Sequence, residues 1–211
     1  MLYNADPRGW AGLVRRADLV ELCFITPIVN VPSILQRGIL SHARAIRLPE
    51  KPLSIAMQTI QDLREKVVVP GGRPLHDYAN LYICARNPMM YKRMGLHASL
   101  CVLRVSPDVL DIPGTIVADG NASSGYARFE PAPEGLRYVD QAATFAERWT
   151  DSVPAAYYRK KSQKCAEVLV PNSVPPNYLM GAYVSGAAGQ VTFVALGTRL
   201  QAVVNTDLFF Q

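Results

Sequence analysis

The chain has 211 residues, 49% of them hydrophobic, which is enough to bury the core of one domain. Its net charge of +5 suits a polyanionic partner without requiring one, because ordinary basic proteins show the same balance. The sequence has no run of about 18 apolar residues and no signal-peptide core, so we expect a cytoplasmic protein without a membrane partner.

The spacing of cysteine and histidine argues against the common metal motifs. The four cysteines include no C-x-x-C pair, and each lies in an apolar stretch. We therefore expect buried, reduced cysteines rather than a zinc or redox site. The three histidines are widely spaced, so no metal site is predicted. These residues are Cys23, Cys84, Cys101, Cys165, His42, His76 and His97.

The first predicted elements are an irregular arm or short helix over residues 1–17 and a buried strand over residues 19–26. A helix follows, with Pro32 in its first turn and residues 33–37 continuing it. Asn30 is suited to cap its start, and Gly38 fits the left-handed position that often ends a helix.

The middle of the chain alternates between short helices and strands. Apolar residues at helical spacing or in short β-branched runs distinguish the two kinds of element. In chain order we predict a helix at residues 54–65, a strand at 81–85, a helix at 89–94, strands at 98–105 and 116–118, and a helix at 143–149.

Strands dominate the last part of the chain. A short buried strand is predicted at residues 167–170, and strands at residues 178–184 and 191–196 are joined by a glycine-rich turn. Short helices at the front and mostly strands at the back predict the α+β class, with one or two antiparallel sheets.

Glu167 begins the strand at residues 167–170, shortly after a basic, tyrosine-rich run that we interpret as a loop. Rings interleaved with cations are typical of surfaces that stack bases and follow phosphates. A carboxylate on a rigid strand beside such a surface can hold a sugar hydroxyl. The simpler alternatives are a strand-edge glutamate paired with a lysine, and a solvated basic loop. The run consists of Tyr157, Tyr158, Arg159, Lys160 and Lys161.

Four segments stand out by their order and wording. They are residues 24–40, which contain SIL and GIL; residues 60–64 with 70–78, which contain LHDY; residues 87–91, which read NPMMY; and residues 119–122, which read DGNA and precede Glu167. This ordered set resembles the DarT family, bacterial toxins that ADP-ribosylate bases in single-stranded DNA. The resemblance covers residues 22–185.

The resemblance implies an ADP-ribosyltransferase-like fold of two packed, mostly antiparallel sheets with short helices, in a single domain over residues 1–211. It implies NAD as co-substrate, single-stranded DNA as substrate, and a DarG-like macrodomain antitoxin that removes the mark. Carried over by position, Glu167 is the catalytic carboxylate, and Arg64 faces the diphosphate and the reacting ribose. The other implied cofactor-binding residues are Phe24, Ile25, Thr26, Asn30, Tyr78 and Met90.

The first strand departs from the family pattern. Family members usually read His-Ile-Thr-His where this chain reads Phe-Ile-Thr-Pro, so Phe24 replaces a histidine that contacts NAD. Backbone groups of that strand can still bind a nicotinamide amide. The departure also fits a subfamily with another target base, thymine or guanine. Two alternatives stay open: a catalytically silent nucleic-acid-binding module on the same scaffold, and ADP-ribosylation of RNA or protein.

The implied roles agree with the chemistry. Cleavage of the nicotinamide–ribose bond builds positive charge on the sugar. A carboxylate facing that charge stabilises the transition state more than the ground state, and it can accept the proton of the attacking base nitrogen. An arginine fork matches diphosphate oxygens. Without the resemblance, pairing of Arg64 with Asp62 or Glu65 on a helix surface is the simpler interpretation.

Overall fold

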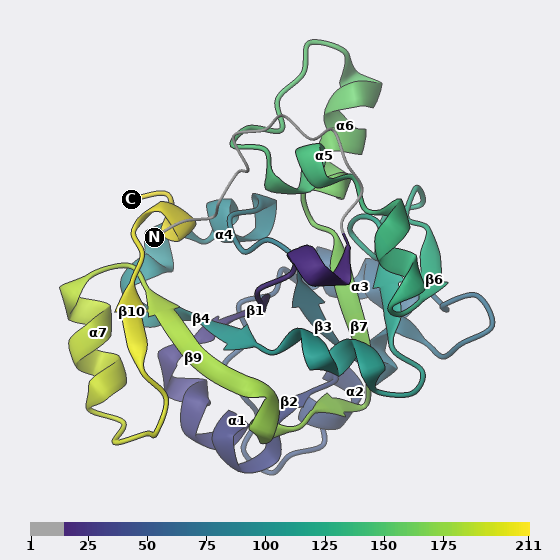
Figure 1. Cartoon of the computed structure of the whole chain (residues 1–211). Coiled ribbons are helices and arrows are strands. Elements are labelled where there is room, and N and C mark those ends of the chain that lie inside the picture. Colours follow the sequence, from purple (N-terminus) through teal and green to yellow (C-terminus); the bar gives the residue numbers. More distant parts are fainter. Residues whose placement is uncertain (1–14) are drawn as a thin grey trace.

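Residues 15–211 are described in the computed structural model, so most of the arm predicted for residues 1–17 lies outside the described residues. The strands are β1 (Leu22–Pro27), β2 (Ile39–Leu40), β3 (Tyr78–Tyr82), β4 (Leu100–Val105), β5 (Ile116–Ala118), β6 (Phe129–Pro131), β7 (Glu167–Pro171), β8 (Ser173–Val174), β9 (Leu179–Val184) and β10 (Ala202–Val204). Eight of them form one sheet in the order β10-β9-β4-β1-β3-β7-β5-β6, while β2 and β8 form a small second sheet (Figure 1). Only the β9–β10 pair is parallel among these strands. The predicted α+β class is confirmed.

The large sheet is joined near its centre by a single residue pair. β1 pairs with β4 over its whole length, but with β3 only where Cys23 faces Tyr82. The sheet therefore consists of two four-stranded halves with one narrow connection. The two predicted sheets are thus one sheet with a seam, accompanied by the small β2–β8 sheet.

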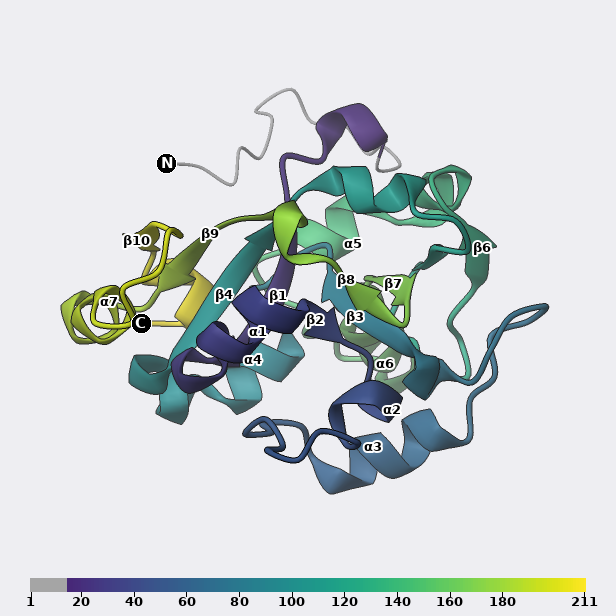
Figure 2. The same ribbon diagram turned by 90° about the horizontal axis from the view of Figure 1, so that it is seen from below.

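Short helices surround the sheets. They are α1 (Val31–Arg37), α2 (His42–Ala45), α3 (Gln58–Glu65), α4 (Pro88–Lys92), α5 (Gln141–Phe145), α6 (Pro154–Gln163) and α7 (Ala187–Val194). The 3-10 helices are η1 (Arg16–Asp18), η2 (Ile28–Asn30), η3 (Leu75–Asp77), η4 (Met94–Ser99), η5 (Pro107–Asp111), η6 (Glu134–Tyr138), η7 (Pro176–Tyr178) and η8 (Asp207–Phe209). Figure 2 shows α2 and α3 together at the lower edge of the molecule, whereas α5 and α6 lie together at the top of Figure 1. Within residues 15–211, no helix has the length and apolar character needed to cross a membrane.

Most of the predicted elements are present with shifted ends. The strand predicted at residues 81–85 is β3, which starts at Tyr78 because its ladder with β7 begins opposite Pro171. The helix predicted at residues 54–65 starts only at Gln58. The helix predicted at residues 143–149 is α5, which ends already at Phe145.

The strand predicted at residues 191–196 is wrong, because these residues belong largely to α7. Gly189 and Phe193, four residues apart, are its buried positions, while Val191 and Val194 are exposed. Burial therefore follows the helical period rather than the alternation of a strand. The β-branched composition that suggested a strand is overridden by packing against β9 and β10.

The loop predicted for residues 157–161 is also wrong, since they lie inside α6. Pro154 occupies the first turn, where its missing N–H is harmless. The alanine, arginine, lysine and glutamine residues that follow Pro154 in α6 are good helix formers. Lys160 and Lys161 lie in the last turn, where cations complement the helix dipole.

Gly38 ends α1 as predicted, with a φ of 86°. A Cβ at this position would clash with the backbone carbonyl oxygen of Val174 in β8. We expect Gly38→Ala to lower the free energy of unfolding by about 1–3 kcal/mol, because it adds left-handed strain to a backbone clash. Gly95→Ala is the control, since a Cβ there meets nothing within 4 Å. Urea denaturation measures both variants, and equal stabilities would contradict the prediction.

Candidate active site

Glu167 is the first residue of β7 and lies in the interior of the large sheet. It faces Tyr82 of β3 on one side and Ala118 of β5 on the other. Val168 belongs to the larger core, whereas Leu169 belongs to a smaller one, so Glu167 shares the sheet face of Leu169. Only 1% of Glu167 is exposed. The carboxylate is therefore held by a strand that is hydrogen-bonded on both edges.

Arg64 of α3 reaches the Glu167 carboxylate. Its Nη1 lies 3.2 Å from Oε1 and 3.1 Å from Oε2, and both side chains are buried. The backbone N–H of Ala122 donates to Oε1 at 3.1 Å. The interpretation of Arg64 as a surface partner of Asp62 or Glu65 is wrong. Because a buried charge needs such partners, the pair indicates that the fold maintains this carboxylate for a purpose.

The turn at residues 119–124 connects α6 to the carboxylate. The N–H of Asn121 donates to the carbonyl oxygen of Ser162 at 2.9 Å, one residue before the donor to Glu167. The Asn121 side chain accepts from Ser123, as a turn residue does. Sequence reasoning missed Ala122, because a backbone donor leaves no signature beyond the DGNA turn itself.

Tyr82 is a second residue that was not predicted for the site. Burial is the main cause that raises the pKa of Tyr82 well above its usual value, and the negative charge of Glu167 is the second. Its phenol therefore stays protonated beside the carboxylate. The signal is the strand register, which places Tyr82 opposite Glu167, and this register is available only from the fold.

The predicted cofactor-binding residues lie in several places. Ile25 and Met90 are buried in the core cluster against which Tyr82 packs, so they lie near the Glu167 site. Phe24 packs instead against the larger core. Tyr78 is buried in a third cluster, and its hydroxyl accepts from the N–H of Arg73 at 3.3 Å.

Thr26 and Asn30 are brought together at the end of β1. Nδ2 of Asn30 donates to Oγ1 of Thr26 at 3.1 Å and to the carbonyl oxygen of Leu53 at 2.9 Å. The N–H of Leu53 donates back to Oδ1 of Asn30 at 3.0 Å. Asn30 precedes α1 as predicted, but its side chain fastens the connector after α2 rather than capping the helix.

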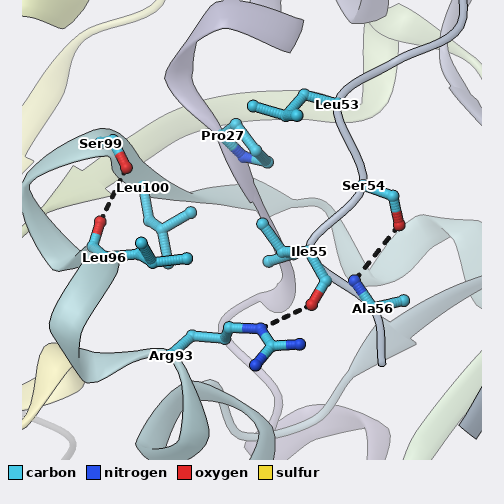
Figure 3. A pocket seen from close by; sticks show the side chains of 9 residues that line it. All are labelled: Pro27, Leu53, Ser54, Ile55, Ala56, Arg93, Leu96, Ser99 and Leu100. Carbon is cyan, nitrogen blue, oxygen red and sulfur yellow. Dashed lines mark hydrogen bonds between the residues drawn. The ribbon is translucent and has the colours of Figure 1, made fainter. Parts of the chain in front are cut away.

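The connector closes a pocket of about 270 Å³ at this end of β1. Nε of Arg93 donates to the carbonyl oxygen of Ile55 at 2.6 Å, which provides a second attachment. Figure 3 shows apolar side chains around the space, and this lining suits a planar ring. Its residues are Pro27, Leu53, Ser54, Ile55, Ala56, Arg93, Leu96, Ser99 and Leu100.

The predicted nucleic-acid residues form a surface on α6. Tyr158 is 60% exposed and packs edge-to-face on Tyr157, with ring centroids 5.3 Å apart. Nζ of Lys161 lies 5.6 Å from the centroid of the Tyr157 ring, and Arg159 is exposed. Lys160 forms an ion pair with Asp151 at 2.7 Å, so its charge is partly neutralised.

The histidines of the chain have structural contacts. His76 of the LHDY segment stacks on His42 with centroids 4.3 Å apart. Burial first, and then nearby positive charges that include Arg64, lower the pKa of both rings. Within residues 15–211, no three His, Cys, Asp or Glu side chains gather in a group that could hold a metal ion.

Lys164 is a buried cation three residues before Glu167. Only 1% of it is exposed, and its Nζ donates to the carbonyl oxygen of Thr144 at 2.8 Å and to Sγ of Cys84 at 3.3 Å. Thr144 belongs to α5, and Cys84 follows β3. Lys164 therefore attaches α5 to the segment that leads into β7.

Comparison with known proteins identifies the family of this chain. Residues 23–207 match the family model described as ssDNA thymidine ADP-ribosyltransferase, DarT. The chain belongs to the DarT family.

Two DarT relatives are close in sequence. A DNA ADP-ribosyl transferase of Thermus sp. (strain 2.9) is 33% identical over 163 residues, which are 72% of this chain and 74% of the relative. A Thermosipho africanus protein, a DNA ADP-ribosyl transferase fused to a DNA ADP-ribosyl glycohydrolase, is 32% identical over 170 residues. The match covers 78% of this chain but only 42% of that fusion protein.

Solved structures of the Thermus sp. 2.9 DarT share the fold. The complex with ADP-ribosylated ssDNA has a TM-score of 0.80 and 25% identity, and the match covers 93% of this chain and 99% of that chain. The complex of the same DarT with carba-NAD+ has a TM-score of 0.74 at 25% identity, over 90% of this chain and 98% of that one. The predicted ADP-ribosyltransferase-like fold is confirmed, and the family is one of NAD-dependent DNA ADP-ribosyltransferases.

Lys164→Ala is expected to lower the free energy of unfolding by about 2–4 kcal/mol, because it opens a cavity and leaves the Thr144 carbonyl unpaired. The control is Lys160→Ala, whose exposed ion pair with Asp151 contributes at most about 1 kcal/mol. Thermal and urea unfolding measure both variants. Similar losses for the two lysines would show that Lys164 does not fasten α5.

Proposed function

We propose that this protein transfers ADP-ribose from NAD to a nucleobase of single-stranded DNA. The observation that carries the proposal is the buried Glu167 carboxylate, fixed by Arg64 and the Ala122 N–H at the end of an interior strand. The Thermus relative's complexes with carba-NAD+ and with ADP-ribosylated ssDNA support both substrates.

The reaction breaks the bond between the ribose C1′ and the nicotinamide nitrogen and forms a bond from C1′ to a base nitrogen. Glu167 faces the positive charge that develops on the ribose, and its carboxylate accepts a hydrogen bond from a sugar hydroxyl. It also takes the proton that the base nitrogen loses. Arg64 contacts Glu167 through Nη1 only, so the rest of its fork is available to the diphosphate.

The protonated phenol of Tyr82 has a place in this scheme. It lies opposite Glu167 and packs with Ile25 and Met90, which the family pattern assigns to the cofactor. A neutral donor at this position can orient the carboxylate or the ribose without adding a competing negative charge. The pocket at the end of β1 takes one ring of the dinucleotide in this proposal.

Thymidine is the target that the family description favours, and guanine is the alternative for a chain that has lost the usual histidine at position 24. The base must leave a duplex stack to reach C1′, which favours single strands. RNA and protein acceptors are tested in the same assay by competition.

We further propose that the protein is the toxin of a toxin–antitoxin pair and acts in the cytoplasm. The fusion of transferase and glycohydrolase in the Thermosipho relative supports a macrodomain partner that removes the mark. Expression of the chain alone should arrest growth of a bacterial host, and co-expression of such a glycohydrolase should relieve the arrest.

Glu167→Ala is expected to lower the transfer rate by about 10²–10⁴-fold, because it removes both the charge stabilisation and the proton acceptor. Labelled NAD and oligonucleotides that contain either thymidine or guanosine as the only reactive base measure the transfer. Glu134→Ala, at an exposed position of η6, is the control and should react like the wild type. No transfer by the wild type, or full transfer by Glu167→Ala, defeats the proposal.

NAD is expected to raise the melting temperature. At a concentration of about 100 Kd it adds about 2.7 kcal/mol, or roughly 5–10 °C for a chain of this size. A silent nucleic-acid-binding module would melt at the same temperature with and without NAD. Differential scanning fluorimetry of the wild type, with and without NAD, therefore separates the two functions.

A further inference from the structure

Three aromatic rings from separate segments meet at α4. Tyr91 of α4 and Trp149 of the α5–α6 loop lie edge-to-face with centroids 5.7 Å apart. Phe210, near the C-terminal residue, lies 5.2 Å from Tyr91 and 6.1 Å from Trp149. Tyr91 is 45% exposed, and Trp149 is half-buried, so the cluster presents aromatic surface to solvent.

Arg86 holds this cluster in place. Its guanidinium carbon lies 4.2 Å from the centroid of the Phe210 ring. Nε donates to Oδ1 of Asp207 at 3.1 Å, and Nη1 donates to the carbonyl oxygen of Glu147 at 3.0 Å. The rings are therefore fixed before any ligand binds, which limits the entropy lost on binding.

Exposed cations are the sequence neighbours of the two outer rings. Lys92 follows Tyr91, and Arg148 precedes Trp149; both are exposed, and neither forms an ion pair within residues 15–211. The acids of the neighbourhood are largely engaged, since Asp207 pairs with Arg86 and Asp151 pairs with Lys160, which leaves Glu147. Rings flanked by unpaired cations match the stacked bases and phosphates of a single strand.

The cluster and α6 flank the same end of β7. Met90 of α4 is buried in the core cluster against which Tyr82 packs, and Tyr82 faces Glu167. Trp149 lies in the loop that leads into α6, and Figure 1 shows α4 and the α5–α6 pair on neighbouring parts of the molecule. The two surfaces are thus both connected to the part of the fold that holds Glu167.

We propose that Tyr91, Lys92, Arg148 and Trp149, here called the α4 platform, bind a second part of the DNA strand that α6 contacts. Tyr91 and Trp149 stack on its bases, and Lys92 and Arg148 contact its phosphates. The inference rests on the proposed function, because its ligand is the strand that carries the target base. It assigns to single-stranded DNA a surface outside the tyrosine-rich helix.

Intrinsic fluorescence tests the stacking directly. The chain has two tryptophans, so Trp10→Phe leaves Trp149 as the only one. Titration with a thymidine oligonucleotide, without NAD, should quench its emission with the midpoint that fluorescence anisotropy gives for binding. Unchanged emission while anisotropy reports binding would overturn the proposal.

Charge reversal tests the phosphate contacts without removing a ring. Lys92→Glu and Arg148→Glu are each expected to weaken binding about tenfold at low salt and to reduce the slope of log K against log [salt] by about 0.7. Arg199→Glu, at an exposed position between α7 and β10, is the control and should bind like the wild type. Melting temperatures confirm that each variant folds.

The outcomes separate this inference from the proposed function. If the wild type binds and modifies single strands while Lys92→Glu and Arg148→Glu bind as tightly as Arg199→Glu, the cluster only fastens the C-terminal residues and this inference fails alone. If the wild type binds no single-stranded DNA in the anisotropy assay, the proposed function fails, and the inference fails with it.

Discussion

The buried contact between Arg64 and Glu167 is the constraint on which the site depends. The two residues are separated by 103 positions in the chain, and each would be an uncompensated buried charge without the other. Such a pair contributes little net stability compared with apolar side chains of the same size, so its presence indicates a chemical role. The pair fixes the position of the carboxylate at the start of β7. In the proposed reaction, a diphosphate would offer Arg64 a second anion, and the carboxylate would become available to the ribose.

The seam of the large sheet explains where this site lies. β1 and β3 share only the pair Cys23 and Tyr82, and Tyr82 is also the residue opposite Glu167. β7, which carries Glu167, is thus separated by one strand, β3, from the seam between the two halves of the sheet. A continuous ladder would close that seam with backbone hydrogen bonds and side chains. The seam therefore lies beside β3, the strand that pairs with the strand of Glu167.

Local patterns predicted the elements that depend on local physics. The β-branched run after Glu167 is a buried strand, Gly38 ends its helix with a left-handed backbone, and Asn87 starts α4 by accepting from the N–H groups of Met89 and Met90. The features that escaped depend on partners far along the chain. Arg64 has the local surroundings of a surface arginine, and only the family resemblance pointed to its role.

Two further features were not predicted correctly for the same reason. α7 is rich in valine and was predicted as a strand, but its burial is decided by β9 and β10. The donor from Ala122 belongs to the backbone, so any residue type could provide it. Sequence therefore identified the family and predicted the role of Glu167, whereas the groups that contact its carboxylate required the fold.

The attachment of the α5–α6 arm shows how a nucleobase can be presented to this carboxylate. Lys164 fastens α5 to the start of β7, Arg86 fastens the loop at Glu147, and Ser162 fastens the end of α6 to the turn beside the carboxylate. An attacking nitrogen must stand about 3–3.5 Å from the sugar carbon in a defined direction. If the arm that carries the DNA surface were loosely attached, the distance between the attacking nitrogen and the sugar carbon would vary widely. Lys164, Arg86 and Ser162 tie this arm to the residue before β7, to the segment after β3 and to the turn at residues 119–124, so in the proposed reaction a base bound on α6 would keep its position relative to Glu167.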